Sequence, residues 1–328
     1  MKLRHVALAL FVSLIVVLSA CRNSDSTTTD NHVLLVANIY NNSITSYRES
    51  DNGNIAPLRT LSCATTPIAV AVNAKNNEIL SVNADASVAV YARNASGDTT
   101  LTRTITGDTT MLHGPNNIAV DNLNSEIIIT NSSIVYSSNT VTYYHITVYA
   151  DDAYGNAAPI RTISGDATEL NAPTSVAVDA VHNEFYVANY GTNSITVYNR
   201  ADTGNVAPLR TIVGNNTGLS NPHGITVDTS NNEILVANFD SNSITVYSRG
   251  SYGDSPPIRT ISGNVTGLNA PTGIAVNTLS NEISVANLRD NSITVYSRAA
   301  SGNVTPLRVI SGGNTNISGP SSIAFASE

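Results

Sequence analysis

Short runs that alternate between hydrophobic and polar residues recur along the chain after residue 31. One unit contains GIAVN (Gly273 to Asn277), EISVAN (Glu282 to Asn287) and NSITVYSR (Asn291 to Arg298), separated by turns rich in Asn, Ser and Gly. Alternation over five or six positions is typical of β-strands, and nothing in this unit has the 3.6-residue period of a helix. The pattern predicts an all-β protein.

The strand pattern is repeated six times. An arginine within a version of PLRTI marks each copy, at separations of 44, 58, 49, 49 and 49 residues. The six positions are Arg59, Arg103, Arg161, Arg210, Arg259 and Arg308. Each copy holds four short strand segments, and four antiparallel strands in about 40 to 50 residues are typical of one propeller blade. A third-strand motif such as NSITVYSR recurs because every blade must present the same packing surface to its neighbour.

The two ends of the repeat region complement each other. VLLVAN (Val33 to Asn38) is a second strand with no first strand before it, and PSSIAF (Pro320 to Phe325) is a first strand with no second strand after it. We therefore expect residues 32–328 to form a six-bladed β-propeller with four antiparallel strands per blade, closed by N- and C-terminal strands that share one blade. Opening such a ring would strip a sheet of its innermost strand.

The first 31 residues predict an export signal and a tether. Residues 1–20 begin with basic residues, continue with an apolar run and end in small residues, which is typical of a signal peptide. The sequence LSAC, ending at Cys21, resembles the lipobox of bacterial lipoproteins, in which the cysteine is lipidated and becomes the new N-terminus. The alternative is an ordinary cleaved signal followed by a chance cysteine. Residues 21–31 are polar and predict a flexible tether.

The lipobox resemblance implies an extracytoplasmic protein that a lipid anchor holds on a membrane without crossing it. Each buried methylene of an acyl chain contributes about 0.8 kcal/mol to such anchoring. Arg22 stands where an aspartate would imply retention in an inner membrane, so the resemblance implies the outer membrane of a cell that has two. The only other cysteine, Cys63, is expected to be a small core residue.

The charge balance argues against nucleic acid as a partner. Without residues 1–20 the chain has 14 basic and 24 acidic residues, a net charge of −10. Eleven of the basic residues belong to the repeat, six in PLRTI and five at Arg48, Arg93, Arg200, Arg249 and Arg298. The remaining ones form no basic patch that could hold a phosphate backbone.

The repeated charges have a structural interpretation. Proline and arginine on an outermost strand are typical of an exposed sheet edge that must not pair with another protein. In most copies the second strand begins with a glutamate. These residues are Glu78, Glu126, Glu184, Glu233 and Glu282. We expect these acids and the arginines to form surface ion pairs that contribute less than about 1 kcal/mol each.

The repeat resembles the NHL family of six-bladed propellers. The stretch PTGIAVNTLSNEISVANLRDNSITVY (Pro271 to Tyr296) carries the resemblance, which covers essentially all of the chain after the tether. It implies a binding or scaffolding module. The chain differs from the family pattern in two ways, since Asn stands where the family often has Asp and Ser where it often has Arg or His. These positions are Asn189, Asn238 and Asn287, and Ser194, Ser243 and Ser292.

Candidate binding residues lie where the copies disagree. The third copy has nine extra residues within SSIVYSSNTVTYYH (Ser132 to His145), which alternate and predict a lengthened hairpin turning near Ser138 and Asn139. Tyr136, Tyr143 and Tyr144 would then offer contact area for a partner, unless the hairpin folds over its own propeller.

Other loops between second and third strands add to the same predicted face. Tyr40, Tyr190, Phe239 and Arg289 occupy comparable loop positions there, among amide and hydroxyl side chains. Aromatic residues in such surroundings suit a protein partner or a glycan. The prediction is therefore a non-catalytic protein- or glycan-binding module that needs no cofactor.

A metal-dependent hydrolase or lyase, with its site at the channel mouth, is the alternative. Propellers that resemble gluconolactonases and peptidyl-amidating lyases place a metal or a carboxylate at the ring axis. His113 and His223 precede two predicted first strands and are candidate ligands of a divalent metal. The other copies have Ala172, Ala270 and Ser318 or their neighbours there, so no set of three histidines is predicted.

Overall fold

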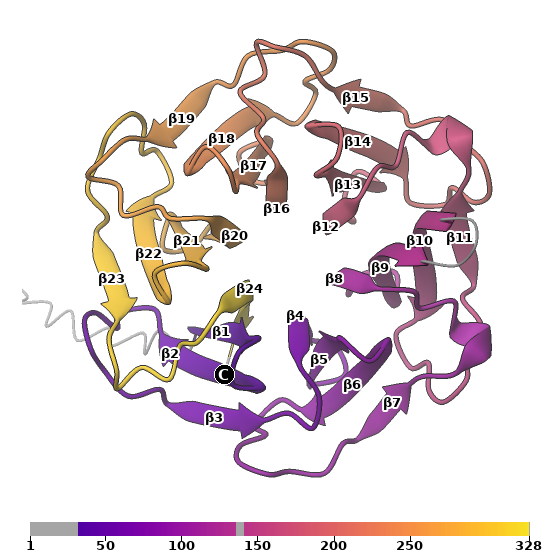
Figure 1. Cartoon of the computed structure of the whole chain (residues 1–328), viewed down its shortest axis with the longest axis horizontal. Coiled ribbons are helices and arrows are strands. Elements are labelled where there is room, and N and C mark those ends of the chain that lie inside the picture. Colours follow the sequence, from indigo (N-terminus) through magenta and orange to yellow (C-terminus); the bar gives the residue numbers. More distant parts are fainter. Residues whose placement is uncertain (1–31, 136–140, 328) are drawn as a thin grey trace, which may run out of the picture. The chain divides into compact units, whose positions relative to one another are not determined.

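The computed structural model describes residues 32–135 and 141–327. These residues form 24 β-strands and two 3-10 helices of three residues, η1 (Asp108–Thr110) and η2 (Asp166–Thr168). The strands make six four-stranded antiparallel sheets arranged around a common axis (Figure 1). The predicted all-β, six-bladed β-propeller is confirmed.

Each blade runs from an innermost first strand near the axis to an outermost fourth strand. The first strands are β4 (Pro67–Asn73), β8 (Pro115–Asp121), β12 (Pro173–Asp179), β16 (Pro222–Asp228), β20 (Pro271–Asn277) and β24 (Pro320–Ser327). The second strands are β1 (His32–Asn38), β5 (Glu78–Asn83), β9 (Glu126–Val135), β13 (Glu184–Asn189), β17 (Glu233–Asn238) and β21 (Glu282–Asn287).

The outer half of each blade holds the third and fourth strands. The third strands are β2 (Ser43–Arg48), β6 (Ser87–Ala92), β10 (Val141–Ala150), β14 (Ser194–Asn199), β18 (Ser243–Ser248) and β22 (Ser292–Ser297). The fourth strands are β3 (Arg59–Ser62), β7 (Arg103–Ile105), β11 (Arg161–Ser164), β15 (Arg210–Ile212), β19 (Arg259–Ser262) and β23 (Arg308–Ser311).

The two ends of the repeat region meet in one blade, as predicted. The C-terminal strand β24 pairs with β1, and Val36 lies opposite Ile323 while Leu34 lies opposite Phe325. The sheet therefore runs β24-β1-β2-β3, with the C-terminal strand innermost. Because the shared blade joins the beginning and the end of the ring, separating β24 from β1 would open the propeller.

Both faces of the third strand are buried, and this explains the repeated motif. In β18, Ile244 and Val246 pack with Tyr296 of the next blade, whereas Tyr247 packs with Val197 of the preceding blade. These side chains are at most 1% exposed. Each blade thus needs apolar residues on both sides, and each of the two sides contacts a different neighbour.

Backbone contacts, in addition to proline and charge, protect the edges of the outer strands from pairing with another protein. Gly253, in the loop that precedes β19, forms a parallel bridge with Ile212 at the edge of the neighbouring outer strand. Its φ of 62° is in the left-handed region, which glycine adopts at little cost. The same bridge occurs at all six blade junctions among the described residues. Backbone groups of each outer strand are therefore paired with the next blade.

Two faces of the ring are distinguished below. On the turn face the second strands begin, next to the turns that follow the first strands. On the loop face the second strands end, next to the connections that lead from one blade to the next. The residues that end the second strands on the loop face are Asn38, Asn83, Asn131, Asn189, Asn238 and Asn287, with β9 continuing further into its hairpin.

Arginine and glutamate on the turn-face side connect neighbouring blades. Glu233 accepts two hydrogen bonds from Arg259 of its own blade, at 2.6 and 2.7 Å, and one of 3.0 Å from Arg298 of the next blade. The three side chains are only 10 to 20% exposed. The weak surface pairs expected from the sequence are therefore partly buried and cross a blade junction. Equivalent groups are Glu126 with Arg161 and Arg200, and Glu184 with Arg210 and Arg249.

The remaining predictions about cysteine and the N-terminus have different outcomes. Cys63 is buried and unpaired, and burial raises the pKa of its thiol to about 11, as expected of a core residue. The predicted signal peptide, Cys21 and the tether lie outside the described residues. Within the described ranges no helix has the length and apolar character of a membrane span.

Candidate functional site

The six inner strands enclose a cavity of about 440 Å³ on the ring axis. Its wall combines aliphatic side chains, most of them from the middle of the inner strands, with Asn, Ser and Thr side chains. Representative aliphatic residues are Val70, Ile118, Val176, Ile225, Ile274 and Ile323. Among the described residues that line this cavity there is no Asp, Glu, Lys, Arg or Cys, and His223 is the single ionisable side chain.

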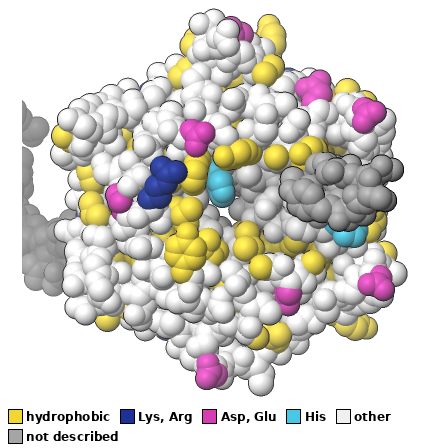
Figure 2. All heavy atoms as spheres, in the orientation of Figure 1, with side chains coloured by type: hydrophobic (Ala, Val, Ile, Leu, Met, Phe, Trp, Pro, Cys, Tyr) yellow, Lys and Arg dark blue, Asp and Glu magenta, His cyan; other side chains and the backbone are white. Residues whose placement is uncertain are grey.

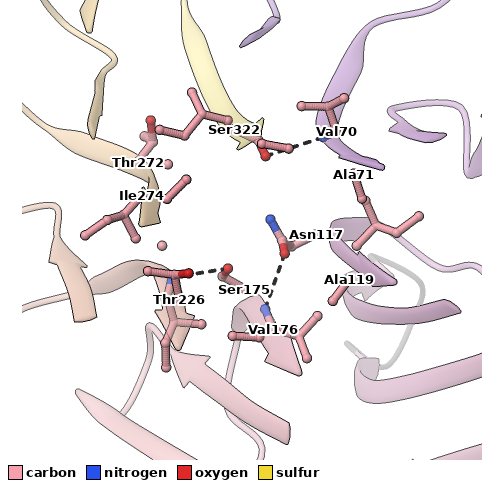
Figure 3. Close-up of a pocket in the computed structure, with 18 of the residues that line it drawn as sticks. Val70, Ala71, Asn117, Ala119, Ser175, Val176, Thr226, Thr272, Ile274 and Ser322 are labelled. Carbon is pink, nitrogen blue, oxygen red and sulfur yellow. Dashed lines mark hydrogen bonds between the residues drawn. The ribbon is translucent and has the colours of Figure 1, made fainter. Parts of the chain in front are cut away.

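Polar side chains in the wall bridge adjacent inner strands. Asn117 Oδ1 accepts a hydrogen bond from the Val176 N–H at 3.3 Å, and Ser322 Oγ accepts one from the Val70 N–H at 3.4 Å (Figure 3). Ser175 accepts in the same way from the next blade at 3.4 Å. These groups are used by the fold, so the wall offers few free polar atoms. The amide nitrogen of Asn117, which points into the cavity in Figure 3, is one that remains available.

A second ring of side-chain contacts lies at the loop-face end of the inner strands. Thr174 Oγ1 donates to the Pro222 carbonyl at 2.9 Å, and Thr272 Oγ1 donates to the Pro320 carbonyl at 2.8 Å. His223 holds the equivalent position in β16, directly after its proline. It therefore lies within its strand, one residue later than the connection where the sequence placed it. Its position is at the mouth of the cavity.

Two apolar side chains at this mouth, Ile39 and Leu288, occupy a position that recurs in all six described blades. The residue after the Asn of each second strand donates its backbone N–H to the connection that enters the same blade, as Phe239 does to the Asn221 carbonyl at 3.1 Å. The residues with this bond are Ile39, Ala84, Ser132, Tyr190, Phe239 and Leu288. We call Ile39, Tyr190, Phe239 and Leu288 the collar. Its four large side chains come from four blades. The other two blades have the small residues Ala84 and Ser132 at this position.

The structure shows that the four candidate loop residues do not all occupy the same position in their blades. Tyr190 and Phe239 are collar members, whereas Tyr40 and Arg289 each lie one position later, beside Ile39 and Leu288. Ile39 and Leu288 line the cavity and were missed. The recurring Asn at the end of each second strand could have identified them in the sequence. Each of the four collar residues directly follows this Asn.

The recurring Asn also explains how the collar is held. Asn238 is fully buried, donates to Thr245 Oγ1 at 2.9 Å and accepts from the Ser220 N–H at 3.1 Å. An amide can donate and accept at once, which an ionised carboxylate cannot do. The departure from Asp in the NHL pattern is thus accommodated by the structure. Asn38, Asn189 and Asn287 make the same pair of contacts.

Three predicted residues from two blades meet beside the mouth. The rings of His223 and Phe239 are stacked with centroids 5.8 Å apart, and the Arg289 guanidinium lies 5.4 Å from the centroid of Phe239. Burial lowers the pKa of His223. In Figure 2 a dark-blue patch of Lys or Arg lies next to the channel, with a histidine between it and the opening and hydrophobic side chains nearby.

The predicted hairpin is present as two strands of ten residues, β9 and β10, paired as far as Val135 and Val141. Its predicted turn and Tyr136 lie outside the described residues. Tyr143 is 47% exposed and stacks on His113 at 5.8 Å, so it remains available on the loop face. Tyr144 instead packs against its own propeller and lines a groove of about 600 Å³ with Leu170. The hairpin therefore folds partly over its own propeller through Tyr144, while Tyr143 stays exposed.

The two histidines proposed as metal ligands do not share a site. His113 is near His145, at 5.7 Å between ring centroids, whereas His223 contacts Phe239 on another blade. The Nε2 of His145 is 2.8 Å from the Met111 carbonyl, and burial lowers the pKa of this imidazole. Within the described part of the chain, no three His, Cys, Asp or Glu side chains are grouped as metal ligands would be.

Comparisons with known proteins agree with the fold. The model of a family described as "Lactonase, 7-bladed beta-propeller" matches residues 137–254, a little over a third of the chain. No curated protein shows significant similarity to the sequence. The chain has six sheets, so it differs in blade number from the family description.

Two solved structures illustrate the likeness. A chain from the crystal structure of a Nidogen/Laminin complex has a TM-score of 0.66 at 16% identity, and a functionally unknown protein from Desulfotomaculum acetoxidans DSM 771 has 0.58 at 12%. Each alignment covers 90% of this chain and 98% of the other. Likeness at such identities concerns the fold and not the activity.

Proposed function

We propose that this protein is an NHL-like propeller that binds a protein partner through its loop face while lipidated Cys21 holds it on the outer membrane. The propeller would act as a scaffold outside the cytoplasm and perform no catalysis. The known fold fits this role, since propellers present many loops on one rigid ring.

The observation that carries the proposal is the exposure of aromatic side chains that individual blades add to the loop face. Tyr40 is 68% exposed and Tyr143 is 47% exposed, and neither position is aromatic in the other blades. Tyrosine supplies a large contact area and a hydroxyl at a low entropic cost, which is why interfaces are enriched in it. The collar extends this surface toward the axis.

Further support comes from the sequence before the propeller and from one structural neighbour. LSAC at Cys21 fits lipid attachment after an apolar segment. One solved chain with this fold belongs to a Nidogen/Laminin complex, so the fold can take part in a protein assembly. A protein partner therefore has more support than a glycan.

Replacing residues 133–142 with a two-residue Asn-Gly turn, together with Tyr143→Ser, would test the partner. This change gives the third blade a hairpin close to the length of those in the other blades, so the ring should fold and the melting temperature should stay within about 2 °C. Capture of proteins from an envelope extract by the purified mature chain should be lost. Unchanged capture would exclude the hairpin as the contact, and capture that only a soluble oligosaccharide competes away would assign the face to a glycan.

The anchor has its own test. Cells fed a fatty acid with an alkyne group should label the wild-type protein, and Cys21→Ser should remain unlabelled and leave the membrane fraction. Labelling of the Cys21→Ser variant would contradict the proposed attachment.

A hydrolase or lyase with a divalent metal at the channel mouth is the second candidate, and the partial match to the lactonase family favours it. His113 or His223 would then contribute a ligand. A stoichiometric metal that survives dialysis and is lost in His113→Ala or His223→Ala, together with hydrolysis of a simple lactone, would support the enzyme over the binding module.

A further inference from the structure

Arg289 differs from every other basic residue that the structure describes. The others lie at the starts of outer strands, at the ends of third strands or in a turn on the turn face. Arg289 is exposed on the loop face, in the loop between β21 and β22. Among the described residues no carboxylate lies within 4 Å of its guanidinium, and its recorded contact is the ring of Phe239. The loop face therefore has one cation without a counterion.

The surroundings of Arg289 favour an anion of low charge. Asp240 and Asp290 are exposed on the same two loops, and Asp290 accepts a hydrogen bond from Asn269 at 2.6 Å. These carboxylates repel a dianion such as a phosphate monoester more strongly than a monoanion. A single planar guanidinium also matches the two oxygens of one carboxylate.

The cavity next to Arg289 is suited to an apolar body. Leu288 lines the cavity and precedes Arg289 in the chain, and His223, which also lines it, stacks on Phe239. The wall beyond these residues carries aliphatic side chains on all six inner strands. Among its polar groups, the hydroxyls of Ser175 and Ser322 accept hydrogen bonds from adjacent strands (Figure 3). A volume of about 440 Å³ is in the range of sites for small organic molecules.

We propose that the channel mouth is a binding site for a small monocarboxylate with an apolar body. Arg289 holds the carboxylate, the collar surrounds the neck of the ligand, and the aliphatic wall of the channel receives its apolar part. This site shares the collar with the proposed partner-binding surface but does not include the hairpin, and it requires no metal. Its test does not depend on whether the partner exists.

Titration calorimetry of the full mature protein with octanoate tests the site. Octanol and octylamine serve as probes of equal chain length that lack the negative charge. The wild-type protein should bind octanoate at least tenfold more tightly than either control, because only the carboxylate can accept two hydrogen bonds from the guanidinium. Arg289→Gln should weaken octanoate binding tenfold or more while leaving octanol binding unchanged.

Two further variants assign the effect to the site. Arg48→Gln removes an exposed arginine from the turn face and should leave octanoate binding unchanged. Ile274→Phe narrows the channel and should weaken octanoate and octanol alike. An apolar tripeptide with a free C-terminus that binds more tightly than octanoate, while its amide does not bind, would identify the carboxylate as a chain end.

The proposal would be overturned by any of three results. These are no octanoate binding by the wild type, equal affinity for octanoate and octanol, and unchanged octanoate affinity in Arg289→Gln. A melting temperature equal to that of the wild type would show that the Arg289→Gln variant is folded, so its result is decisive in either direction.

Discussion

The turn face of this propeller repeats the same contacts at several blade junctions, whereas the loop face has different residues in different blades. On the turn face, three successive junctions repeat one arrangement, in which a glutamate such as Glu233 joins an arginine of its own blade to an arginine of the next. On the loop face, equivalent positions hold Ile39, Ala84, Ser132 and Phe239, among others. The repeated face serves the ring, because every junction needs the same contacts. The varied face is where one blade can acquire a property that the others lack.

Apolar residues are exposed on the turn face as well, and they support this distinction. Leu123, Val181 and Leu279 are 69 to 77% exposed, but they occupy the same turn after three different first strands. Tyr40 and Tyr143 have no such counterparts. Repeated exposure is explained by the repeat itself, whereas the single aromatic residues require another explanation.

The largest expected effect is the loss of a glutamate that joins two blades. Glu233→Ala removes three hydrogen bonds from two partly buried arginines, Arg259 and Arg298, and leaves them only the more distant Asp228, 3.9 Å from Arg298 Nε. We expect a loss of about 2 to 3 kcal/mol in the free energy of unfolding. Thermal denaturation should show a melting temperature about 5 °C lower.

Glu282→Ala is the matched control for that change. Glu282 pairs with Arg308, but Glu49 stands where Arg298 stands in the preceding junction, and its charge also acts on Arg308. Glu282 therefore holds one arginine where Glu233 holds two, and among the described residues it has no arginine partner across the junction, so the loss should be smaller. Equal losses in the two variants would contradict the assigned role of the cross-blade contact.

A somewhat smaller effect is expected from the buried amide that positions the collar. Asn238→Ala removes the partner of Thr245 and of the Ser220 N–H, which should cost about 1 to 3 kcal/mol. Hydrogen exchange of the Ser220 amide should become faster. Asn215→Ala, at an exposed position in the same connection, should change neither quantity.

Acid should weaken the turn face before the loop face. Hydrogen bonds from Arg210 lower the pKa of Glu184 from 4.5 to about 2, and those from Arg259 lower the pKa of Glu233. A lowered native pKa stabilises the fold above the ordinary value, and this contribution is lost as pH falls from about 4.5 towards 2. Melting temperatures measured over this range should fall less steeply for Glu184→Gln than for the wild type. Identical slopes would argue against the pairing.

The smallest effect on stability is expected where we place the function. Tyr40→Ser changes a side chain that is 68% exposed, so the free energy of unfolding should change by less than about 0.5 kcal/mol. Partner capture should nevertheless decrease. A large drop in melting temperature would show instead that Tyr40 serves the fold.

The sequence was sufficient for the architecture and not for the site. The spacing of PLRTI and the complementary ends at Val33 and Phe325 predict six blades and their closure, because strand order along the chain determines their order in a propeller blade. The contact of Phe239 with Arg289 could not be read in this way, since it joins two blades 50 residues apart through side-chain directions. The partly buried state of Glu233 was missed because burial across a junction depends on how closely the blades pack.

Photo-crosslinking compares the two faces most directly. A benzophenone amino acid would replace Tyr40 or Tyr143 on the loop face and Leu279 on the turn face, each exposed by 47% or more. Our account predicts crosslinks to the same partner from Tyr40 and Tyr143 and none from Leu279. Crosslinks from Leu279 alone would place the partner on the turn face and contradict the account.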